Sequence, residues 1–317
     1  MGWMGRQQIP LYLAAILFGA VIGSAAPSLA PGLSVSINPV LGLLLFATFL
    51  GVPLIKVGKA FRDIRFLGAV LVVNFVVVPL VVWGLSQFVA GNRALFVGVL
   101  LVLLAPCVDY VIVFTGIAGG AKERLLAVAP LLMLLQIFLL PVFLLLFAGS
   151  EAASLIEVGP FAEAFFILIA IPLFLAAVVQ ALATRNRTGR VIEQVMQALM
   201  VPLMMATLAV VVGSQISGVG SRIGQLVLVV PLYVAFLLVM LIIGIVAGRV
   251  SQLDVPATRA LVFSGATRNS LVVLPLALSL PPSLSLVPLA VVTQTLVELV
   301  GMIVFVRLVP RLTPLRK

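Results

Sequence analysis

Long apolar runs alternate with short breaks rich in charge, proline or glycine along the whole chain. Each run is close to the roughly 20 residues that an α-helix needs to cross a bilayer, and the alternating pattern of a membrane β-barrel is absent. The pattern predicts an all-α integral membrane protein with ten transmembrane helices, in a single transmembrane domain over residues 1–317. The predicted spans are residues 9–26, 37–55, 66–90, 94–117, 124–148, 161–183, 193–215, 225–248, 258–280 and 286–308.

The composition excludes several classes of function. Of the 317 residues, 63% are hydrophobic and 9% are charged, which is far from the mix of a soluble domain. The chain has no histidine and one cysteine, so it lacks an intramolecular disulfide and the usual ligands of zinc and haem. A membrane enzyme would need a nucleophile and a base near one interface, whereas the acids of interest lie within the spans. We therefore expect no enzyme, no cofactor and no structural metal.

The net charge of +10 comes mostly from the breaks between spans, so it does not indicate nucleic-acid binding. Sixteen of the nineteen Lys and Arg residues fall on one side of the predicted membrane, Arg93 and Arg222 fall on the other, and Arg268 lies within the ninth span. By the positive-inside rule the richer side is the cytoplasm. This predicts a multi-pass protein of the cell (inner) membrane with both termini cytoplasmic, and it supports an even number of spans.

An internal repeat is suggested by short motifs that recur in corresponding spans. The matching residues are Arg93-Ala94-Leu95 and Arg259-Ala260-Leu261, then Pro130 with Gln136 and Pro288 with Gln294. These matches predict two five-helix halves, at approximately residues 1–150 and 151–317. Because five is odd, the second half must be inverted relative to the first. Inverted repeats with interrupted helices near the midplane are typical of secondary transporters.

Four ionisable side chains fall within the predicted spans. They are Cys107, Asp109, Arg268 and Glu298. A charge at the bilayer centre costs roughly 3 kcal/mol by insertion scales, so each charged group needs a partner or a function. Pro106 lies directly before the cysteine, at a position that a continuous helix does not favour. We therefore expect a broken helix that lines a polar pocket at this point.

Asp109 and Arg268 lie at similar positions in the paired fourth and ninth spans. We expect them to face each other where both helices are interrupted and to form a crossover ion pair. Thr267, Asn269 and Ser270 would supply neutral polar contacts there. Such a pair either takes part directly in transport or only holds two broken helices together, and the sequence leaves both interpretations open.

Glu298, in the tenth span, is left without a cation once the crossover pair forms. A carboxyl group in a medium of low dielectric is costly to ionise, so Glu298 is a candidate proton carrier. Gln294 and Thr295 lie four and three residues earlier on the same helix face, and with Gln136 they are supporting polar residues. The alternative is a protonated glutamic acid that only forms hydrogen bonds between helices.

Cys107 is a candidate contact for the solute. A soft sulfur suits a thiophilic solute, and the preceding proline places it in a span that is polar in the middle. The alternative is a small buried hydrophobic residue, which is a common role for a free cysteine. With the neutral side chains of Asn269 and Ser270, Cys107 forms the predicted substrate-binding set.

Three segments carry a resemblance to a known family. They are Ala105-Pro106-Cys107 with Val111-Ile112-Val113-Phe114, the ninth-span segment Phe263-Ser264-Gly265-Ala266-Thr267-Arg268-Asn269, and the segment around Glu298. Over essentially its whole length the chain resembles the arsenite-efflux permeases of the bile acid/sodium symporter superfamily. The resemblance implies arsenite transport in which Cys107 and Glu298 take part. It also implies a panel and core arrangement in which the fourth and ninth spans cross as interrupted helices.

The chain departs from that branch at the crossover. The arsenite permeases typically continue the Ala-Pro-Cys motif with Thr-Ala-Met, whereas this chain continues with Val108-Asp109-Tyr110. They carry paired asparagines followed by Phe-Glu in the ninth span, whereas this chain has Arg268-Asn269-Ser270-Leu271. In sodium-coupled relatives the crossover holds sodium through oxygen ligands. We expect the guanidinium of Arg268 to take that place, so that protons rather than sodium drive transport.

These observations predict a proton-coupled antiporter that exports arsenite or antimonite and confers arsenical resistance. It would move a small inorganic or anionic solute across the lipid bilayer by alternating access. The second interpretation is an organic-anion transporter of the same fold, in which Arg268 binds a carboxylate and Cys107 only packs. The third is a membrane protein that binds partners and transports nothing.

Overall fold

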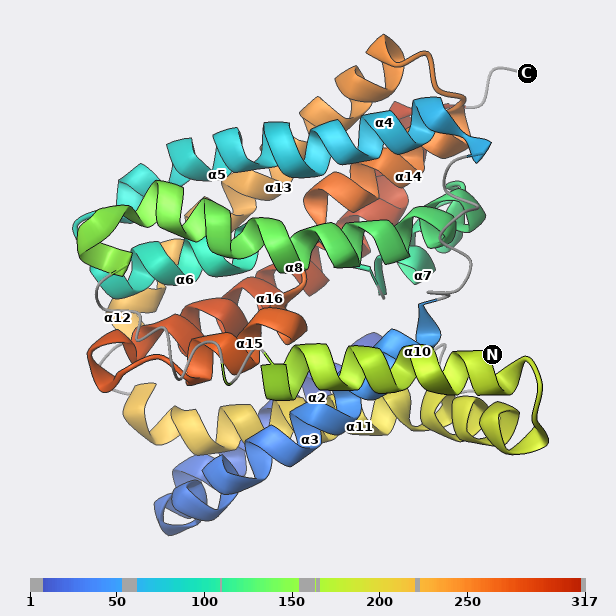
Figure 1. Ribbon diagram of the computed structural model, residues 1–317. Helices are drawn as coiled ribbons and strands as arrows, with labels where there is room; N and C mark the ends of the chain where they lie inside the picture. Colours follow the sequence, from blue (N-terminus) through green and yellow to red (C-terminus); the bar gives the residue numbers. More distant parts are fainter. Residues whose placement is uncertain are drawn as a thin grey trace. The chain divides into compact units, whose positions relative to one another are not determined.

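The computed structural model describes residues 8–52, 62–108, 110–153, 163, 166–219 and 223–314 (Figure 1). Over these residues the regular structure is helical, apart from an isolated antiparallel bridge between Pro106 and Arg268. The chain divides into two compact units, and each unit combines a segment from either half of the sequence. The first unit comprises Met1–Gly51 and Gly159–Gln225, and the second comprises Val52–Val158 and Leu226–Lys317.

The first unit consists of largely uninterrupted helices. Its described elements are α2 (Gln8–Ala25), η1 (Pro27–Leu29), α3 (Ala30–Gly51), η5 (Phe166–Ala170), α10 (Ile171–Ala183) and α11 (Arg187–Val219), and the short α12 (Ile223–Leu226) begins in it. Helix α11 packs along both α2 and α3, and α10 packs on α3 and α11. The unit is therefore a small helix bundle.

Small residues bring α2 and α11 close together in the first unit. Gly19 and Gly23 are four residues apart on α2, and they face Ala209 and Gly213 of α11. A Cβ atom added at either α2 glycine would overlap backbone atoms of α11. Small residues at this spacing let two helix backbones approach each other, which is a common way of packing helices in a membrane.

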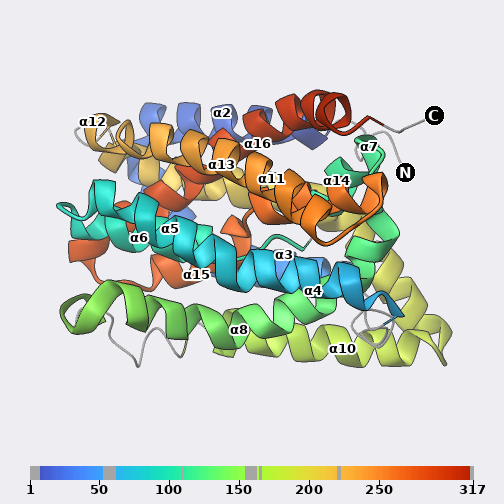
Figure 2. The same ribbon diagram turned by 90° about the horizontal axis from the view of Figure 1, so that it is seen from above.

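The second unit contains interrupted helices. Its elements are α4 (Ile64–Val72), η3 (Val73–Val77), α5 (Val78–Ser86), η4 (Gln87–Val89), α6 (Arg93–Leu103), α7 (Tyr110–Ile117), α8 (Lys122–Ala153), α13 (Val229–Val250), α14 (Val255–Ala266), α15 (Ser270–Leu278), η6 (Pro282–Leu284) and α16 (Leu286–Leu312). Figure 2 shows α4 and α5 as one continuous rod, joined by the π-helical turn η3. Helix α16 packs against α6, α13 and α15, and α13 packs against α14.

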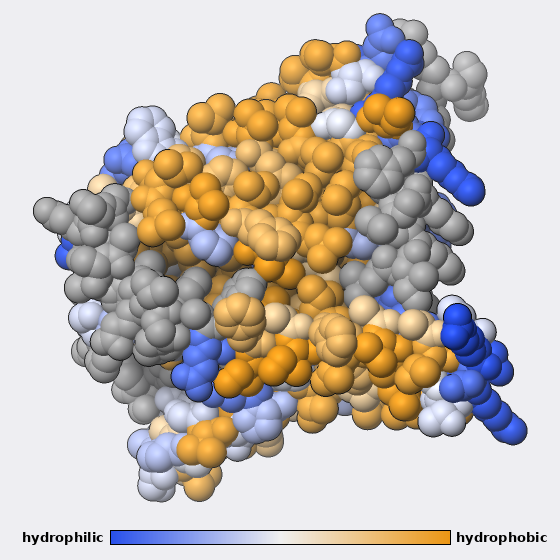
Figure 3. All heavy atoms as spheres, viewed as in Figure 1, coloured by the Kyte–Doolittle hydropathy of each residue, from blue (hydrophilic) through white to orange (hydrophobic). Residues whose placement is uncertain are grey.

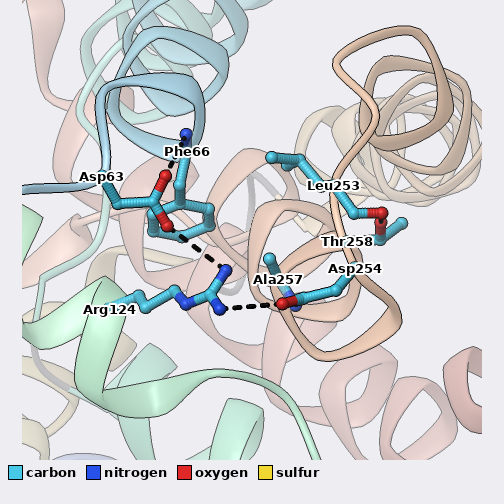
Figure 4. Close-up of polar contacts among 7 residues, drawn as sticks. All are labelled: Asp63, Phe66, Arg124, Leu253, Asp254, Ala257 and Thr258. Carbon is cyan, nitrogen blue, oxygen red and sulfur yellow. Dashed lines mark hydrogen bonds and ion pairs between the residues drawn. The ribbon is translucent and has the colours of Figure 1, made fainter.

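Side-chain caps fix several helix starts in the second unit. Asp63, Asn92, Asp254 and Asn269 each accept a hydrogen bond from a backbone N–H three residues later, at the starts of α4, α6, α14 and α15. Arg124, in the first turn of α8, forms ion pairs with Asp63 at 3.2 Å and Asp254 at 2.7 Å (Figure 4). One arginine therefore joins the starts of three helices.

Six helices within the described residues are long and apolar enough to cross a membrane. They are Pro27–Gly51, Ile64–Val89, Lys122–Ala148, Arg187–Ser214, Val229–Val250 and Leu286–Leu312, and three shorter apolar helices are Pro10–Ala25, Arg93–Leu103 and Ile171–Ala183. Hydrophobic side chains cover the sides of the helices, and hydrophilic side chains gather at helix ends (Figure 3). The chain is therefore a multi-pass membrane protein.

The described helices overlap the predicted apolar runs, but some of their ends differ. Helix α11 begins at Arg187 rather than at 193, and α16 ends at Leu312 rather than at 308. These ends extend beyond the apolar runs because polar residues continue a helical backbone as well as apolar ones do. The fourth and ninth predicted spans are each divided in two, which is the expected interruption.

The Arg-Ala-Leu triplets do not occupy equivalent positions in their helices. Arg93 is the first residue of α6, whereas Arg259 lies four residues after Val255, the first residue of α14. The equivalence is clearer at the breaks, where Pro106 is bridged to Arg268. The triplet match is therefore about one helical turn out of register with that bridge, and the inverted ten-helix repeat stays a prediction.

Candidate functional site

Two helix breaks meet in the second unit. Helix α6 ends at Leu103 before Pro106, and α14 ends at Ala266. Across the breaks the N–H of Cys107 donates to the carbonyl of Thr267 at 3.3 Å, and the N–H of Asn269 donates to the carbonyl of Ala105 at 2.8 Å. This antiparallel pairing provides hydrogen-bond partners for backbone groups that each interrupted helix would otherwise leave unpaired within the membrane.

The guanidinium of Arg268 is fully buried at this crossing, with 0% of its surface exposed. Its Nη atoms donate to four oxygens, and its Cζ lies 5.5 Å from the ring centroid of Phe236. The acceptors are the carbonyls of Ser264 (2.8 Å), Gly265 (2.6 Å) and Leu103 (3.4 Å) and the Oδ1 atom of Asn74 (2.9 Å).

The position of these carbonyls explains how the positive charge is stabilised. Leu103 is the last residue of α6, and Ser264 and Gly265 lie in the last turn of α14. The C-terminal end of a helix carries a partial negative charge and carbonyls that lack partners within the helix. Arg268 therefore lies where two helix ends supply oxygen ligands to a cation.

Asn74 is a site residue that the sequence analysis missed. It lies in the π-helical turn η3 and is buried. Its Nδ2 atom donates to the carbonyl of Val70 and to Oγ of Ser264, both at 3.0 Å, and its Oδ1 accepts from Arg268. An asparagine in the middle of the apolar third span was the available signal, because a buried amide in a membrane requires partners.

Glu298 is hydrogen-bonded rather than isolated. Its side chain is 1% exposed, and its Oε2 accepts from the backbone N–H of Arg268 at 2.8 Å and from Nε2 of Gln294 at 2.5 Å. The sequence predicts a carboxyl group without a cation nearby. The structure gives it two N–H donors, one of them a peptide group next to the buried guanidinium.

The neutral residues predicted around Arg268 connect other elements. Ser270, the first residue of α15, and Thr295 of α16 are joined through their hydroxyl groups at 2.8 Å. The Oδ1 atom of Asn269 caps α15, and the hydroxyl of Thr267 donates to the carbonyl of Phe263 at 2.7 Å. These residues therefore hold the broken helices in place, and they link α15 to α16.

The remaining predicted site residues have different positions. Cys107 is fully buried between α6 and α7, as a free cysteine. Gln136 lies on α8, 2% exposed, and its Oε1 has no hydrogen-bond partner among the described residues. Asp109 lies outside the described residues, so the predicted pair with Arg268 stays a prediction.

Arg259 has a structural role that the charge count did not indicate. It is buried, and it donates to the carbonyls of Ala118 (3.0 Å) and Gly119 (3.4 Å) after α7 and to the hydroxyl (3.0 Å) and carbonyl (2.7 Å) of Thr313 after α16. A second buried guanidinium therefore binds oxygens at two helix ends, where the partial charge is negative.

Comparison with known proteins identifies the family. No curated protein sequence is similar enough to the chain to count as a match. Residues 38–225, which are 188 of the 317, match the Sodium Bile acid symporter family. This stretch includes the first break, η3 with Asn74, and Cys107. The family is one of transporters of small solutes in membranes. The chain belongs to the Sodium Bile acid symporter family.

Proposed function

We propose that this protein is a sodium-independent secondary transporter that exports arsenite, with antimonite as a second substrate of the same chemistry, in exchange for protons. The observation that carries the proposal is the guanidinium of Arg268 among four oxygens at the crossing of two broken helices. Carbonyl and amide oxygens are the ligands that a sodium ion would use. A fixed side-chain cation in that position makes a sodium ion unnecessary for holding the crossing together.

Alternating access is the transport mechanism that we propose. The chain would form ten transmembrane helices in two inverted five-helix halves, with both termini in the cytoplasm of the cell membrane. Each compact unit takes one segment from either half of the sequence, which supports such a repeat. In transporters of this kind, one group of helices moves against the other around a site at the midplane.

Glu298 is the proposed proton carrier. It is buried on α16 and contacts the peptide N–H of Arg268, so its charge is close to the crossing. Ionisation removes a donor and adds a negative charge, whereas protonation does the reverse, and both changes alter its contacts with Gln294. Proton uptake from one side and release to the other would thus couple to the state of the crossing.

Cys107 is the proposed contact for the arsenic atom. Its backbone is bonded across the crossing to Thr267, so the thiol belongs to the same break as Arg268. A soft sulfur ligand favours a soft, thiophilic centre such as trivalent arsenic or antimony over a carboxylate. Asn269 and Ser270 would contribute polar groups to the same site.

Transport into proteoliposomes tests this proposal. Purified protein is reconstituted, and arsenite flux is measured with a proton gradient, a sodium gradient or neither. We expect flux that follows the proton gradient and is unchanged by sodium. Both Cys107→Ser and Cys107→Ala should abolish arsenite flux. If Cys107 only packs as a small buried residue, Cys107→Ala should instead leave the flux intact.

Three outcomes would contradict parts of the proposal. A requirement for sodium would overturn the role given to Arg268. Transport of an organic anion that survives Cys107→Ser, without arsenite flux, would identify an organic-anion transporter. No flux of any solute, together with a stable partner in a pull-down, would identify a membrane protein that does not transport.

A further inference from the structure

Gln294 of α16 has two amide atoms in different surroundings. The side chain is 2% exposed, and its Nε2 donates to Oε2 of Glu298 at 2.5 Å. Its Oε1 is buried and has no hydrogen-bond partner within the described part of the chain. A buried acceptor without a partner costs about 1–3 kcal/mol. An acceptor of this kind beside a functional carboxylate is therefore a place where a ligand could donate a hydrogen bond.

The orientation of that amide depends on Glu298. The same Oε2 atom accepts from the backbone N–H of Arg268, and a peptide N–H only donates. An ionised carboxylate only accepts, so the NH2 group of Gln294 must face it and the carbonyl must face away. A protonated Glu298 has an O–H donor, whose best partner in Gln294 is the carbonyl. The amide then turns, and its NH2 group faces away instead.

A complementary donor belongs to the same crossing. Asn269 is flanked by Arg268 and Ser270, which are bonded to Glu298 and Thr295 of α16 respectively. Asn269 therefore lies between two links to the turn of α16 that contains the unpaired acceptor. Its Nδ2 atom is buried and has no partner in the residues that the structure describes. A buried donor and a buried acceptor that both lack a partner suit a hydroxyl-bearing ligand, because a hydroxyl group also donates and accepts.

We propose that Gln294 is a specificity-determining residue that accepts a hydrogen bond from a hydroxyl group of the solute while Glu298 is ionised. The proposal rests on the transport function proposed above and adds the class of solute: a neutral, hydroxyl-bearing molecule, of which trihydroxy arsenic(III) is an example. Amide groups suit a neutral solute, because they offer hydrogen bonds without charge. Solute binding and proton release are coupled through the direction of one amide.

Other charged or titratable groups around Glu298 have defined positions. Arg268 and Cys107 lie at the crossing, and Tyr233 of α13 donates through its hydroxyl to the carbonyl of Ala290 on α16. The remaining ones lie at helix ends. They are Arg93 at the start of α6, Tyr110 at the start of α7, Arg249 at the end of α13, and Arg259, which is bound to Thr313. Among the described residues, Glu298 is thus the one carboxylate at the crossing.

Arsenite flux in proteoliposomes tests the proposal, with the half-saturating concentration (KM) and the maximal rate measured from mildly acidic to neutral pH. In the wild type KM should fall as the pH rises, because an ionised Glu298 turns the Gln294 carbonyl toward the solute. Gln294→Met keeps a similar shape and removes both amide atoms. We expect its KM to be up to about tenfold higher at neutral pH and to be independent of pH, with flux still measurable at saturation.

Gln180→Met is the matched control, because Gln180 is a buried glutamine of the first unit that binds the carbonyls of Phe49 and Leu50. It should lower thermal stability and leave the pH dependence of KM as in the wild type. A KM of Gln294→Met that keeps the wild-type pH dependence would overturn the proposal.

A second probe separates this proposal from the arsenite function. Boric acid is neutral and hydroxyl-bearing but does not bind thiols, so its uptake should depend on Gln294 and not on Cys107. Wild-type vesicles that move boric acid with this dependence, but no arsenite, would overturn the arsenite assignment alone. Boric acid uptake that is equal in the wild type and in Gln294→Met would overturn the role of Gln294 alone. Movement of neither probe by the wild type would overturn both.

Discussion

The two compact units stabilise their interiors in different ways. In the first unit, α2 and α11 meet through Gly19 and Gly23, and its buried polar side chains among the described residues are uncharged. The buried charged side chains of the described chain, Arg259, Arg268 and Glu298, all lie in the second unit. The buried charges lie in the unit that contains interrupted helices. The ends of such helices have unpaired carbonyls, whereas the carbonyls within a continuous helix are hydrogen-bonded inside it.

The ends of interrupted helices are places where a membrane protein can hold a charge away from water. A buried arginine needs several oxygen acceptors, and Arg268 donates to carbonyls at the ends of α6 and α14. A bundle of uninterrupted helices such as the first unit offers few such acceptors in its interior. We therefore expect the stability of the first unit to depend mainly on the size and shape of its side chains. The stability of the second should depend on charge and hydrogen bonding.

The largest effect is expected for Arg268→Met, which leaves four oxygen acceptors without their donor. A buried acceptor left without a donor typically costs about 1–3 kcal/mol, and this change leaves several of them at once. Arg268→Lys keeps the charge but lacks the planar fork that reaches both helix ends, so it should be intermediate. Thermal unfolding in nanodiscs measures both changes.

A third variant, Arg268→Ser, tests whether the guanidinium takes the place of a sodium ion among these oxygens. Sodium should raise the unfolding temperature of Arg268→Ser, because the smaller side chain vacates the position of the cation, and should not change that of the wild type. Equal responses to sodium would contradict the assignment of Arg268 as a fixed cation. A wild-type stability in Arg268→Met would contradict the comparison of the two units.

Asn74→Val should have the next largest effect, at about 1–3 kcal/mol, because it removes one of the acceptors of Arg268 and the amide that donates to the hydroxyl oxygen of Ser264. Valine has a similar size and suits the apolar surroundings of α4 and α5. Thermal unfolding should show this loss, and the double variant Asn74→Val with Arg268→Met should lose less than the sum of the two. Additive losses would show that the two side chains act independently.

The crossing was predictable in part from the sequence. Pro106 indicated the break after α6, and isolated charges in apolar runs indicated Arg268 and Glu298 as site residues. Asn74 was missed because its helix is apolar and continuous, and only the fold brings η3 against the end of α14. The hydrogen bond from the N–H of Arg268 to Glu298 was not predictable either, because it depends on how the backbone turns at the break.

The first unit offers a test of shape with one substitution at two positions. Gly23→Ala places a methyl group against the backbone of Gly213, whereas nothing lies within 4 Å of the equivalent atom at Gly32 on α3. Overpacking typically costs about 1–3 kcal/mol. Gly32→Ala should instead be neutral or stabilising by up to about 1 kcal/mol, because alanine favours a helix. Equal unfolding temperatures for the two variants would contradict the close approach of α2 and α11.

The smallest effect is expected for Arg124→Gln, although Arg124 binds two carboxylates in the second unit (Figure 4). Its side chain is 42% exposed, so water and salt screen both ion pairs, and such pairs contribute about 0–1 kcal/mol. The loss should shrink at high salt. Arg307→Gln, the same loss of charge at an exposed position of α16, is the control. Asp63 and Asp254 keep their helix caps when Arg124 is replaced. A loss of stability in Arg124→Gln as large as that in Arg268→Met would therefore mean that burial does not explain why the two arginines differ.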